Sequence, residues 1–362
     1  MKLPVAGALS ALLLAASPAL RAQAPVIETK TPPPVLKPEA LIDALTVEEL
    51  DEVITLLRDN FIKPEMLGDL SLKRATVQGA LARLAPGASI LQAPVEGVSA
   101  TSPFRSEVLD GRIGYVRLGS STPANVAELD AALAKFTETK LGSLILDLRA
   151  TPGSSEVEQM AEVCRRFVPK GKVLFSVRKA NVKQEQVLTS RDDPKFRGII
   201  VVLVDRATAG TAEVIAAVLH TYVNAMVIGQ QTRGEAVEFA DFPLASGKLV
   251  RIAVAEVALP DETTVFPRGV KPDLAVEVPP ETTEAVLKQG LAKGVAELVF
   301  EVERVRMNEA ALVAGSNPEL DAAQAAQKNK TERKPLLRDA VLQRAVDFIT
   351  TLAIYERAKP RK

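Results

Sequence analysis

The chain has 362 residues, 47% of them hydrophobic, with 45 basic and 45 acidic side chains and a formal net charge of zero. This length suffices for a large core. The balanced charge gives no global electrostatic reason to bind nucleic acid or an anionic membrane. One histidine and one cysteine exclude an internal disulfide and a transition-metal site of the usual type, and nothing in the sequence implies a cofactor.

The first residues have the pattern of an export signal. A basic start, an apolar stretch over residues 5–20 and an A-x-A pattern at residues 22–24 predict a signal peptide over residues 1–24. The apolar run is too short for a permanent span, so we expect an exported bacterial protein, periplasmic or extracellular, with no membrane span in the mature chain. Residues 25–44 are rich in proline and predict an extended lead-in.

Residues 45–90 predict an N-terminal helical segment. Thr46 and Glu49 have the spacing of a capping box at the start of a first helix. A second helix is predicted over residues 72–84, since Pro86 and Gly87 would end it. The apolar face of the first helix consists of Leu50, Val53, Ile54 and Leu57.

The next residues alternate between strand and helix patterns. Residues 104–118 predict a hairpin with its turn at Asp110 and Gly111. A helix is predicted over residues 123–137, and the continuous apolar run at 144–149 is typical of a buried parallel strand. This alternation indicates an α/β fold with parallel pairing.

Residues 199–204 predict another buried strand, followed by a turn of small residues and an amphipathic helix. Either Thr208 or Thr211 is expected to cap that helix. His220, near the end of the helix, is interpreted as a surface residue or a partner of the helix dipole. Cys164 lies on an apolar stripe with helical spacing, which favours a buried small hydrophobe over a reactive thiol.

Residues 281–362 predict a helical extension with a polar linker over 314–335 and a final helix that packs back. Apolar residues step by four and three within a helix predicted over 281–312. Three interpretations stay open: packing onto its own domain, self-association, or docking of a partner. The residues of this seam are Leu291, Val295, Leu298, Val302 and Val305.

Five segments resemble the carboxyl-terminal processing, or tail-specific, serine peptidases. They are the active-site turn at 204–214, the Leu-Asp-Leu-Arg-x-x-Pro-Gly motif at 146–153, residues 227–235, the closing Gly-x-x-Pro-Asp pattern at 269–273, and the helix predicted over 342–349. The resemblance implies a peptidase-like core over residues 100–280 with a crotonase-like (ClpP/crotonase superfold) spiral of ββα units. It also implies protein or peptide segments as partners.

The PDZ module of these peptidases is missing from its expected place. Only about two dozen residues separate Ser89 from Ile113, whereas such a module needs on the order of 80. A PDZ module therefore cannot lie between these residues, and we expect partners to be recognised by another part of the chain.

The resemblance also implies a degenerate active site. The family uses a serine nucleophile and a lysine general base. Matched position by position, the nucleophile falls on Gly210, the lysine on Glu235, and a third polar residue on Thr221. A glycine has no side chain with which to attack a carbonyl carbon.

The backbone part of the site does not depend on side-chain identity. The family's oxyanion hole corresponds to the N–H groups of Gly153 and Thr211, and the helix N-terminus adds a favourable dipole. Arg233 is expected to offset the charge of Glu235. These residues predict a residual cleft that binds a polypeptide terminus or an extended segment.

Three functions follow as hypotheses. The preferred one is an inactive pseudopeptidase that binds polypeptide segments or acts as a scaffold in the cell envelope. The first alternative is an active serine-type endopeptidase with a non-standard nucleophile, either a threonine or a residue that the position-by-position match misplaces. The second is a small hydrophobic ligand-binding protein, which predicts an apolar pocket.

Overall fold

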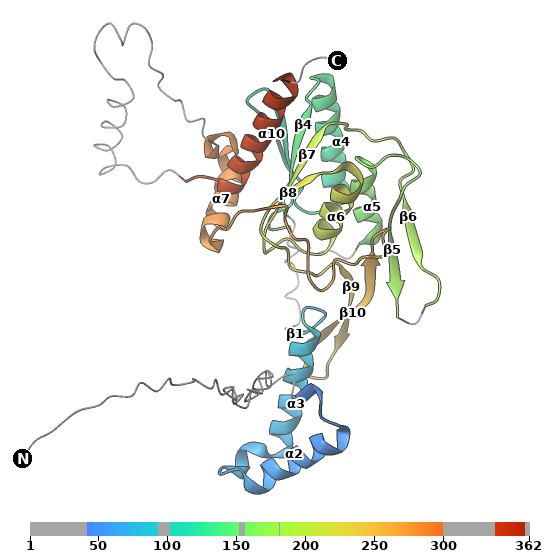
Figure 1. Cartoon of the computed structure of the whole chain (residues 1–362), viewed down its shortest axis with the longest axis vertical. Helices are drawn as coiled ribbons and strands as arrows, with labels where there is room; N and C mark the ends of the chain where they lie inside the picture. Colours follow the sequence, from blue (N-terminus) through green and yellow to red (C-terminus); the bar gives the residue numbers. More distant parts are fainter. Residues whose placement is uncertain (1–41, 93–101, 152–155, 181, 300–336, 359–362) are drawn as a thin grey trace, which may run out of the picture. The chain divides into compact units, whose positions relative to one another are not determined.

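The computed structural model describes residues 42–92, 102–151, 156–180, 182–299 and 337–358. The chain divides into two compact units, residues 1–74 and 75–362 (Figure 1). The predicted signal peptide, most of the proline-rich lead-in and the predicted polar linker lie outside the described residues.

The first unit contains α2, a short turn and the start of α3. Helix α2, Val47–Asn60, begins with the predicted capping box: the Thr46 hydroxyl accepts the Glu49 N–H, and the Glu49 carboxylate accepts the Thr46 N–H at 2.7 Å. The 3₁₀ turn η1, Pro64–Leu67, precedes α3, Asp69–Leu84, which starts earlier than predicted. The predicted apolar face of α2 is exposed.

The second unit is organised around a six-stranded sheet with the order β11-β8-β7-β4-β3-β2. Neighbouring strands run parallel, except β2 and β3, which form the predicted hairpin. Asp110 and Gly111 have φ values of 50° and 62°, as a two-residue hairpin turn requires. The strands are β2 (Arg105–Leu109), β3 (Ile113–Arg117), β4 (Ser143–Asp147), β7 (Ile199–Val204), β8 (Met226–Gly229) and β11 (Leu274–Ala275).

Helices pack on both faces of this sheet, and each face has its own hydrophobic cluster (Figure 1). Helices α4, α5 and α6 contribute to one cluster, and α10 contributes to the other. Successive residues of a strand point to opposite faces, so Val116 lies with α4–α6 while Tyr115 and Arg117 lie on the α10 face. The helices are α4 (Pro123–Glu138), α5 (Val157–Arg165), α6 (Thr211–Val223) and α10 (Ala340–Ala358).

The second unit also contains an antiparallel sheet that the sequence analysis did not predict. Strand β10 pairs with β1, β5 and β9, and β5 pairs with β6. Its strands are β1 (Ala88–Leu91), β5 (Val173–Lys179), β6 (Gln186–Thr189), β9 (Val237–Pro243) and β10 (Leu249–Ala258). Strand β1 belongs to the segment that was expected to be helical.

The helix predicted over 281–312 is shorter than expected. Helix α7, Pro280–Lys293, ends at Gly294, whose φ of 98° lies outside the helical region. Val295 packs into the α10 cluster, and Leu298 is fully buried in the 3₁₀ turn η2, Ala296–Leu298. The prediction that the seam residues form one continuous face of a single helix is therefore wrong. Two of these residues lie outside the described residues: Val302 and Val305.

Candidate functional site

The segment that resembles the peptidase active-site turn joins β7 to α6. Strand β7 ends at Val204, and α6 begins at Thr211; residues 205–211 are called the elbow below. At the N-cap of α6, Gly210 has φ 57° and ψ −118°, a conformation that L side chains rarely adopt. Nucleophilic serines at strand-to-helix elbows occupy sharp, strained turns of this kind. The backbone thus forms an elbow at the position where the sequence has no side chain.

Asp205 and Thr208 hold the elbow to the end of the neighbouring strand β4. The Asp205 carboxylate accepts the N–H groups of Ala150 and Ala207, each at 3.0 Å. The Thr208 hydroxyl accepts the Asp205 N–H at 2.9 Å and lies 3.0 Å from the Leu148 carbonyl oxygen. These bonds fix the turn after β7 against the turn after β4.

A buried carboxylate, Glu213, joins the elbow to the segment that follows β8. Its Oε2 accepts the N–H groups of Gly210 and Glu235, at 2.9 and 2.7 Å. Its Oε1 accepts the Gly234 N–H at 2.6 Å and the Thr232 hydroxyl. Burial raises the pKa of Glu213 above its ordinary value, although these four hydrogen bonds favour the charged form. Since one oxygen binds both N–H groups, the elbow and the Glu235 backbone are near neighbours.

This arrangement corrects the predicted helix cap. Gly210 is the N-cap of α6, and the Glu213 carboxylate takes its N–H as the N3 acid of a capping box does. The Thr208 hydroxyl accepts the Asp205 N–H after β7, and Thr211 is the first helical residue. The prediction of a threonine cap is wrong, because the N-cap position is occupied by Gly210 and neither threonine stands there.

The side chains of Arg233 and Glu235 pair at the rim of this arrangement. The Arg233 guanidinium lies 3.6 Å from the Glu235 carboxylate, and about half of the arginine side chain is exposed. The Arg233 N–H donates to the Thr208 carbonyl at 3.1 Å. An acid with an arginine partner thus occupies the position that the resemblance assigns to a lysine base.

The structure brings some of the predicted site residues together and not others. Gly210, Thr211 and Glu235 meet at Glu213 or at the start of α6. Thr221 is exposed near the end of α6, about 16 Å along the axis from the elbow, and its hydroxyl donates to the Ala217 carbonyl. The oxyanion-hole candidate Gly153 lies outside the described residues.

His220 and Cys164 lie away from the elbow. The His220 ring is half exposed and lies 3.1 Å from the Asp273 carboxylate. Cys164 is fully buried in α5, and burial raises the pKa of its thiol to about 12. Within the described part of the chain, no set of three or more His, Cys, Asp or Glu side chains has the arrangement of a metal site.

None of the described helices combines the length and apolarity needed to cross a membrane.

A second set of buried charges lies on the α10 face of the sheet. Asp147, at the end of β4, accepts the Tyr115 hydroxyl at 2.8 Å and two guanidinium N–H groups of Arg149, at 2.7 and 2.9 Å. Arg149 also donates to both oxygens of Asp339, and Asp339 accepts the Leu342 N–H at the start of α10. This set, Tyr115, Asp147, Arg149 and Asp339, is called the charge cluster below.

The charge cluster is almost fully excluded from solvent, with no member more than 2% exposed. Burial alone would raise the pKa of Asp147, but the Arg149 guanidinium outweighs burial and holds that pKa below its ordinary value. The cluster therefore ties the Leu-Asp-Leu-Arg motif to the C-terminal helix through ionised side chains.

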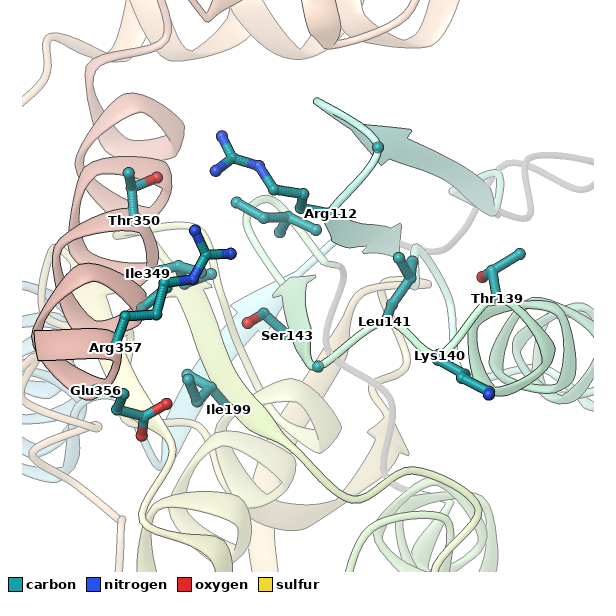
Figure 2. Close-up of a pocket in the computed structure, with 14 residues that line it drawn as sticks. Arg112, Thr139, Lys140, Leu141, Ser143, Ile199, Ile349, Thr350, Glu356 and Arg357 are labelled. Carbon is teal, nitrogen blue, oxygen red and sulfur yellow. The ribbon is translucent and has the colours of Figure 1, made fainter. Parts of the chain in front are cut away.

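Pockets lie at both ends of the parallel strands. One, of about 330 Å³, lies at the N-terminal ends. Figure 2 shows Ile349, Glu356 and Arg357 of α10 across this pocket from Arg112 and Ser143. It contains none of the predicted site residues. The other, of about 430 Å³, lies at the carboxyl ends, where open α/β sheets commonly bind ligands.

Sequence reasoning missed the residues that hold the site together. Glu213 had a local signal, since it is an acid at the third position of a helix that is otherwise apolar in its first turns. The sequence around Asp339 contains no signal that pairs it with Arg149, because 190 residues separate the two.

Comparisons with known proteins agree with the motifs. Residues 112–276 match the model of peptidase family S41. The carboxy-terminal processing protease CtpA of Bacillus subtilis is 30% identical over 211 residues, which are 58% of this chain and 40% of that protein. A carboxy-terminal-processing protease of Bartonella bacilliformis is 31% identical over 180 residues, 47% of this chain and 40% of that protein. A solved photosystem II D1 C-terminal processing protease is 23% identical with a TM-score of 0.41, covering 58% of this chain and 53% of that one.

The matched region lies within the α/β core described above. Residues 112–276 match the model of peptidase family S41, and the chain is similar to the carboxy-terminal processing proteases. The predicted resemblance is confirmed. The chain spans about two fifths of the length of these curated relatives.

Proposed function

We propose that this protein is a pseudopeptidase, which binds extended polypeptide segments at the elbow without hydrolysing them. The observation that carries the proposal is the conformation of Gly210, an elbow backbone with no side chain, held by Glu213 beside Glu235. In this assignment Gly210 stands at the nucleophile position and Glu235 at the base position. Glycine has no attacking atom, and Glu235, paired with Arg233, replaces the family's lysine base with a carboxyl group that has no nucleophile at position 210 to activate.

Binding does not require the lost side chains. Helix α6 begins at Thr211, and the dipole at its N-terminus favours a carbonyl or carboxylate oxygen. The Arg233 guanidinium offsets the charge of Glu235, which would otherwise oppose such a group.

The finer parts of the proposal follow from the family resemblance. We propose that the parallel sheet and its helices form a crotonase-like spiral of ββα units. We also propose export to the periplasm or beyond, on the signal-peptide pattern of residues 1–24. The names of the relatives describe processing of carboxyl termini, so protein segments in the cell envelope are the proposed partners.

Chemical labelling tests the assignment of the elbow. Wild-type residues 25–362, the Gly210→Ser/Glu235→Lys variant and the Gly210→Ala/Glu235→Lys variant are compared with a serine-reactive fluorophosphonate and an unstructured protein substrate. The alanine variant is the matched control, because it imposes the same backbone strain without a hydroxyl. We expect an inert wild type and labelling of the serine variant alone. Cleavage of the substrate by the wild-type protein would overturn the proposal.

A peptide titration tests the binding function. Unstructured peptides are added to the labelled wild-type protein, and amide shifts are followed by NMR. The expected result is saturable change at Thr211 and Glu235, with little change at Thr221 on the far end of α6. If no amide shift of an elbow residue changed at millimolar peptide, the proposed binding function would be wrong.

The active-endopeptidase alternative requires a non-standard nucleophile, of which a threonine of the elbow is one candidate. The Thr208 hydroxyl is fully buried and bonded at the strand ends, which disfavours attack by that residue. The small-ligand alternative gains support from the 430 Å³ pocket at the carboxyl ends of the strands.

A further inference from the structure

The pocket at the carboxyl ends of the strands contains a buried arginine with unused donors. Arg117, the last residue of β3, is 4% exposed and lines this pocket. Its Nε and Nη1 atoms have no hydrogen-bond partner among the described residues. A buried guanidinium with unpaired donors is costly, so each such group calls for an explanation.

The nearest carboxylate does not satisfy Arg117. Asp147 Oδ1 lies 3.8 Å from Arg117 Nη1, which is beyond hydrogen-bonding distance. The Asp147 oxygens already accept the Tyr115 hydroxyl and three donors of Arg149. Arg117 and Asp147 thus form an ion pair, but the buried Nε and Nη1 atoms of Arg117 keep donors that no described residue accepts.

The other charges around the pocket nearly balance, so the preference for an anion comes mainly from Arg117. Arg206 lines the pocket but pairs with Glu277 at 3.0 Å, and Lys288 is offset by the two acids Asp205 and Glu284. The Asp205 carboxylate is bonded to backbone N–H groups of the elbow and of the turn after β4. The first turn of α7 forms part of the wall, and its N-terminal dipole adds to the preference.

The rest of the wall suits an alkyl chain better than a peptide. Its apolar members are Ala150, Ala207, Pro280, Leu287 and Leu291. The Gln230 amide already donates to Glu277 at 2.7 Å, and the Asp205 oxygens are occupied. Peptide groups placed here would find few free partners, and unpaired buried amides are costly.

Helix α7, the outer wall of the pocket, is fixed to the sheet. The Arg105 guanidinium of β2 donates to the Leu291 carbonyl at 2.8 Å, and Glu107 of β2 accepts the Val295 N–H just beyond the helix. The pocket is thus formed by elements that hold one another within the second unit.

We propose that this pocket binds a small amphipathic monocarboxylate of the fatty-acid type, with its carboxylate on Arg117 and its alkyl chain against Leu287 and Leu291. The site is distinct from peptide binding at the elbow, although both use the turn after β7. The proposal goes beyond the pseudopeptidase function and stands or falls separately from it.

Calorimetric titration of the full chain with decanoate and with decanol tests the proposal. The two probes share a tail and differ in the charged group. We expect one-to-one binding of decanoate, at least about tenfold tighter than decanol, which corresponds to roughly 1.4 kcal/mol. NMR shifts at Leu287 and Ala150 locate the site. Equal affinities, or no binding of decanoate, would overturn the proposal.

Variants separate the carboxylate contact from the tail contact. Arg117→Met keeps the apolar stem and should lower decanoate affinity to that of decanol. Arg117→Lys should retain part of the preference. Leu287→Trp fills the pocket with Arg117 in place and should abolish binding of both probes, so it decides the question even if the Arg117 variants do not fold. Arg112→Met, at the opposite end of β3, is the matched control and should change neither affinity.

Two results would contradict the assignment. Retention of the decanoate preference in folded Arg117→Met would exclude Arg117 as the anion site. Tighter binding of N-acetyl-leucyl-leucine than of decanoate would show that the pocket takes a peptide terminus instead of a fatty acid.

Discussion

Two buried acids at the carboxyl ends of the strands are stabilised in opposite ways. Glu213 accepts three backbone N–H groups and a hydroxyl, with no basic side chain among its hydrogen-bond donors. Asp147 is paired with Arg149, which also holds Asp339. The pKa of Glu213 is raised and that of Asp147 is lowered, because burial dominates at the first and the guanidinium at the second.

The difference shows which part of the site tolerates sequence change. The backbone N–H of Glu235 does not depend on the side chain at that position, so it can hold the elbow without a catalytic lysine. Gly234 must stay a glycine, because its φ is 79° and a Cβ would lie 2.2 Å from the Pro267 carbonyl oxygen. The charge cluster instead depends on the identity of each member. Removal of one charge there leaves another buried without a partner.

The largest expected effect comes from removing the shared cation of the charge cluster. Arg149→Met would leave Asp147 and Asp339 buried without their main partner, which typically costs about 3–5 kcal/mol of unfolding free energy. Urea unfolding measures the change. Arg112→Met, an exposed arginine, should shift the midpoint little. Addition of Asp339→Asn to Arg149→Met should recover part of the loss, and strict additivity would contradict the coupling.

A smaller loss is expected at the elbow carboxylate. Glu213→Gln places an NH₂ group against N–H donors, so at least one buried donor loses its acceptor, at a cost of about 1–3 kcal/mol. The measurement is urea unfolding together with hydrogen exchange at Gly210, Gly234 and Glu235. Glu238→Gln, on the edge of the other sheet, is the control. Unchanged protection at all three amides would show that Glu213 does not hold the elbow.

The conformation of Gly210 predicts a loss of similar or smaller size. Gly210→Ala places a Cβ on a residue with φ 57°, and such strain costs on the order of 1–3 kcal/mol. Gly142→Ala is the matched control, because that glycine has ordinary φ and no heavy atom within 4 Å of a built Cβ. Equal thermal stability of the two variants would mean that the elbow relaxes.

The smallest effects, and the sharpest contrast, are expected in the pH dependence of stability. The lowered pKa of Asp147 makes its contribution complete above the ordinary value of 3.8 and lost as pH falls through the folded-state pKa. The raised pKa of Glu213 gives a contribution that is complete below its ordinary value of 4.5 and lost as pH rises through the folded-state pKa.

Unfolding curves of wild type, Asp147→Asn and Glu213→Gln between pH 3 and pH 7 measure both contributions. The stability of wild type relative to Asp147→Asn should rise with pH, and that relative to Glu213→Gln should fall. If both stability differences changed with pH in the same direction, the two acids would not be stabilised in opposite ways.

The sequence by itself determined the local elements and the family. The capping box at Thr46, the Asp110-Gly111 turn and the buried strands of residues 144–149 and 199–204 follow from side-chain chemistry and period, which act over a few residues. The family motifs indicated which strand-to-helix turn corresponds to the peptidase active site, the turn after residues 199–204. The same reasoning located the degenerate positions Gly210 and Glu235, and their assignment stays a prediction.

Tertiary structure alone decided how these elements are held together. Nothing local in Asp339 points to Arg149, and nothing local in Arg117 shows that its donors lack partners. The heptad seam failed because Gly294 ends α7 and the core takes up Val295, a choice made by packing and not by helical period. Buried charge is paired across long chain separations because its cost in a low-dielectric interior is met only by partners that folding brings into contact.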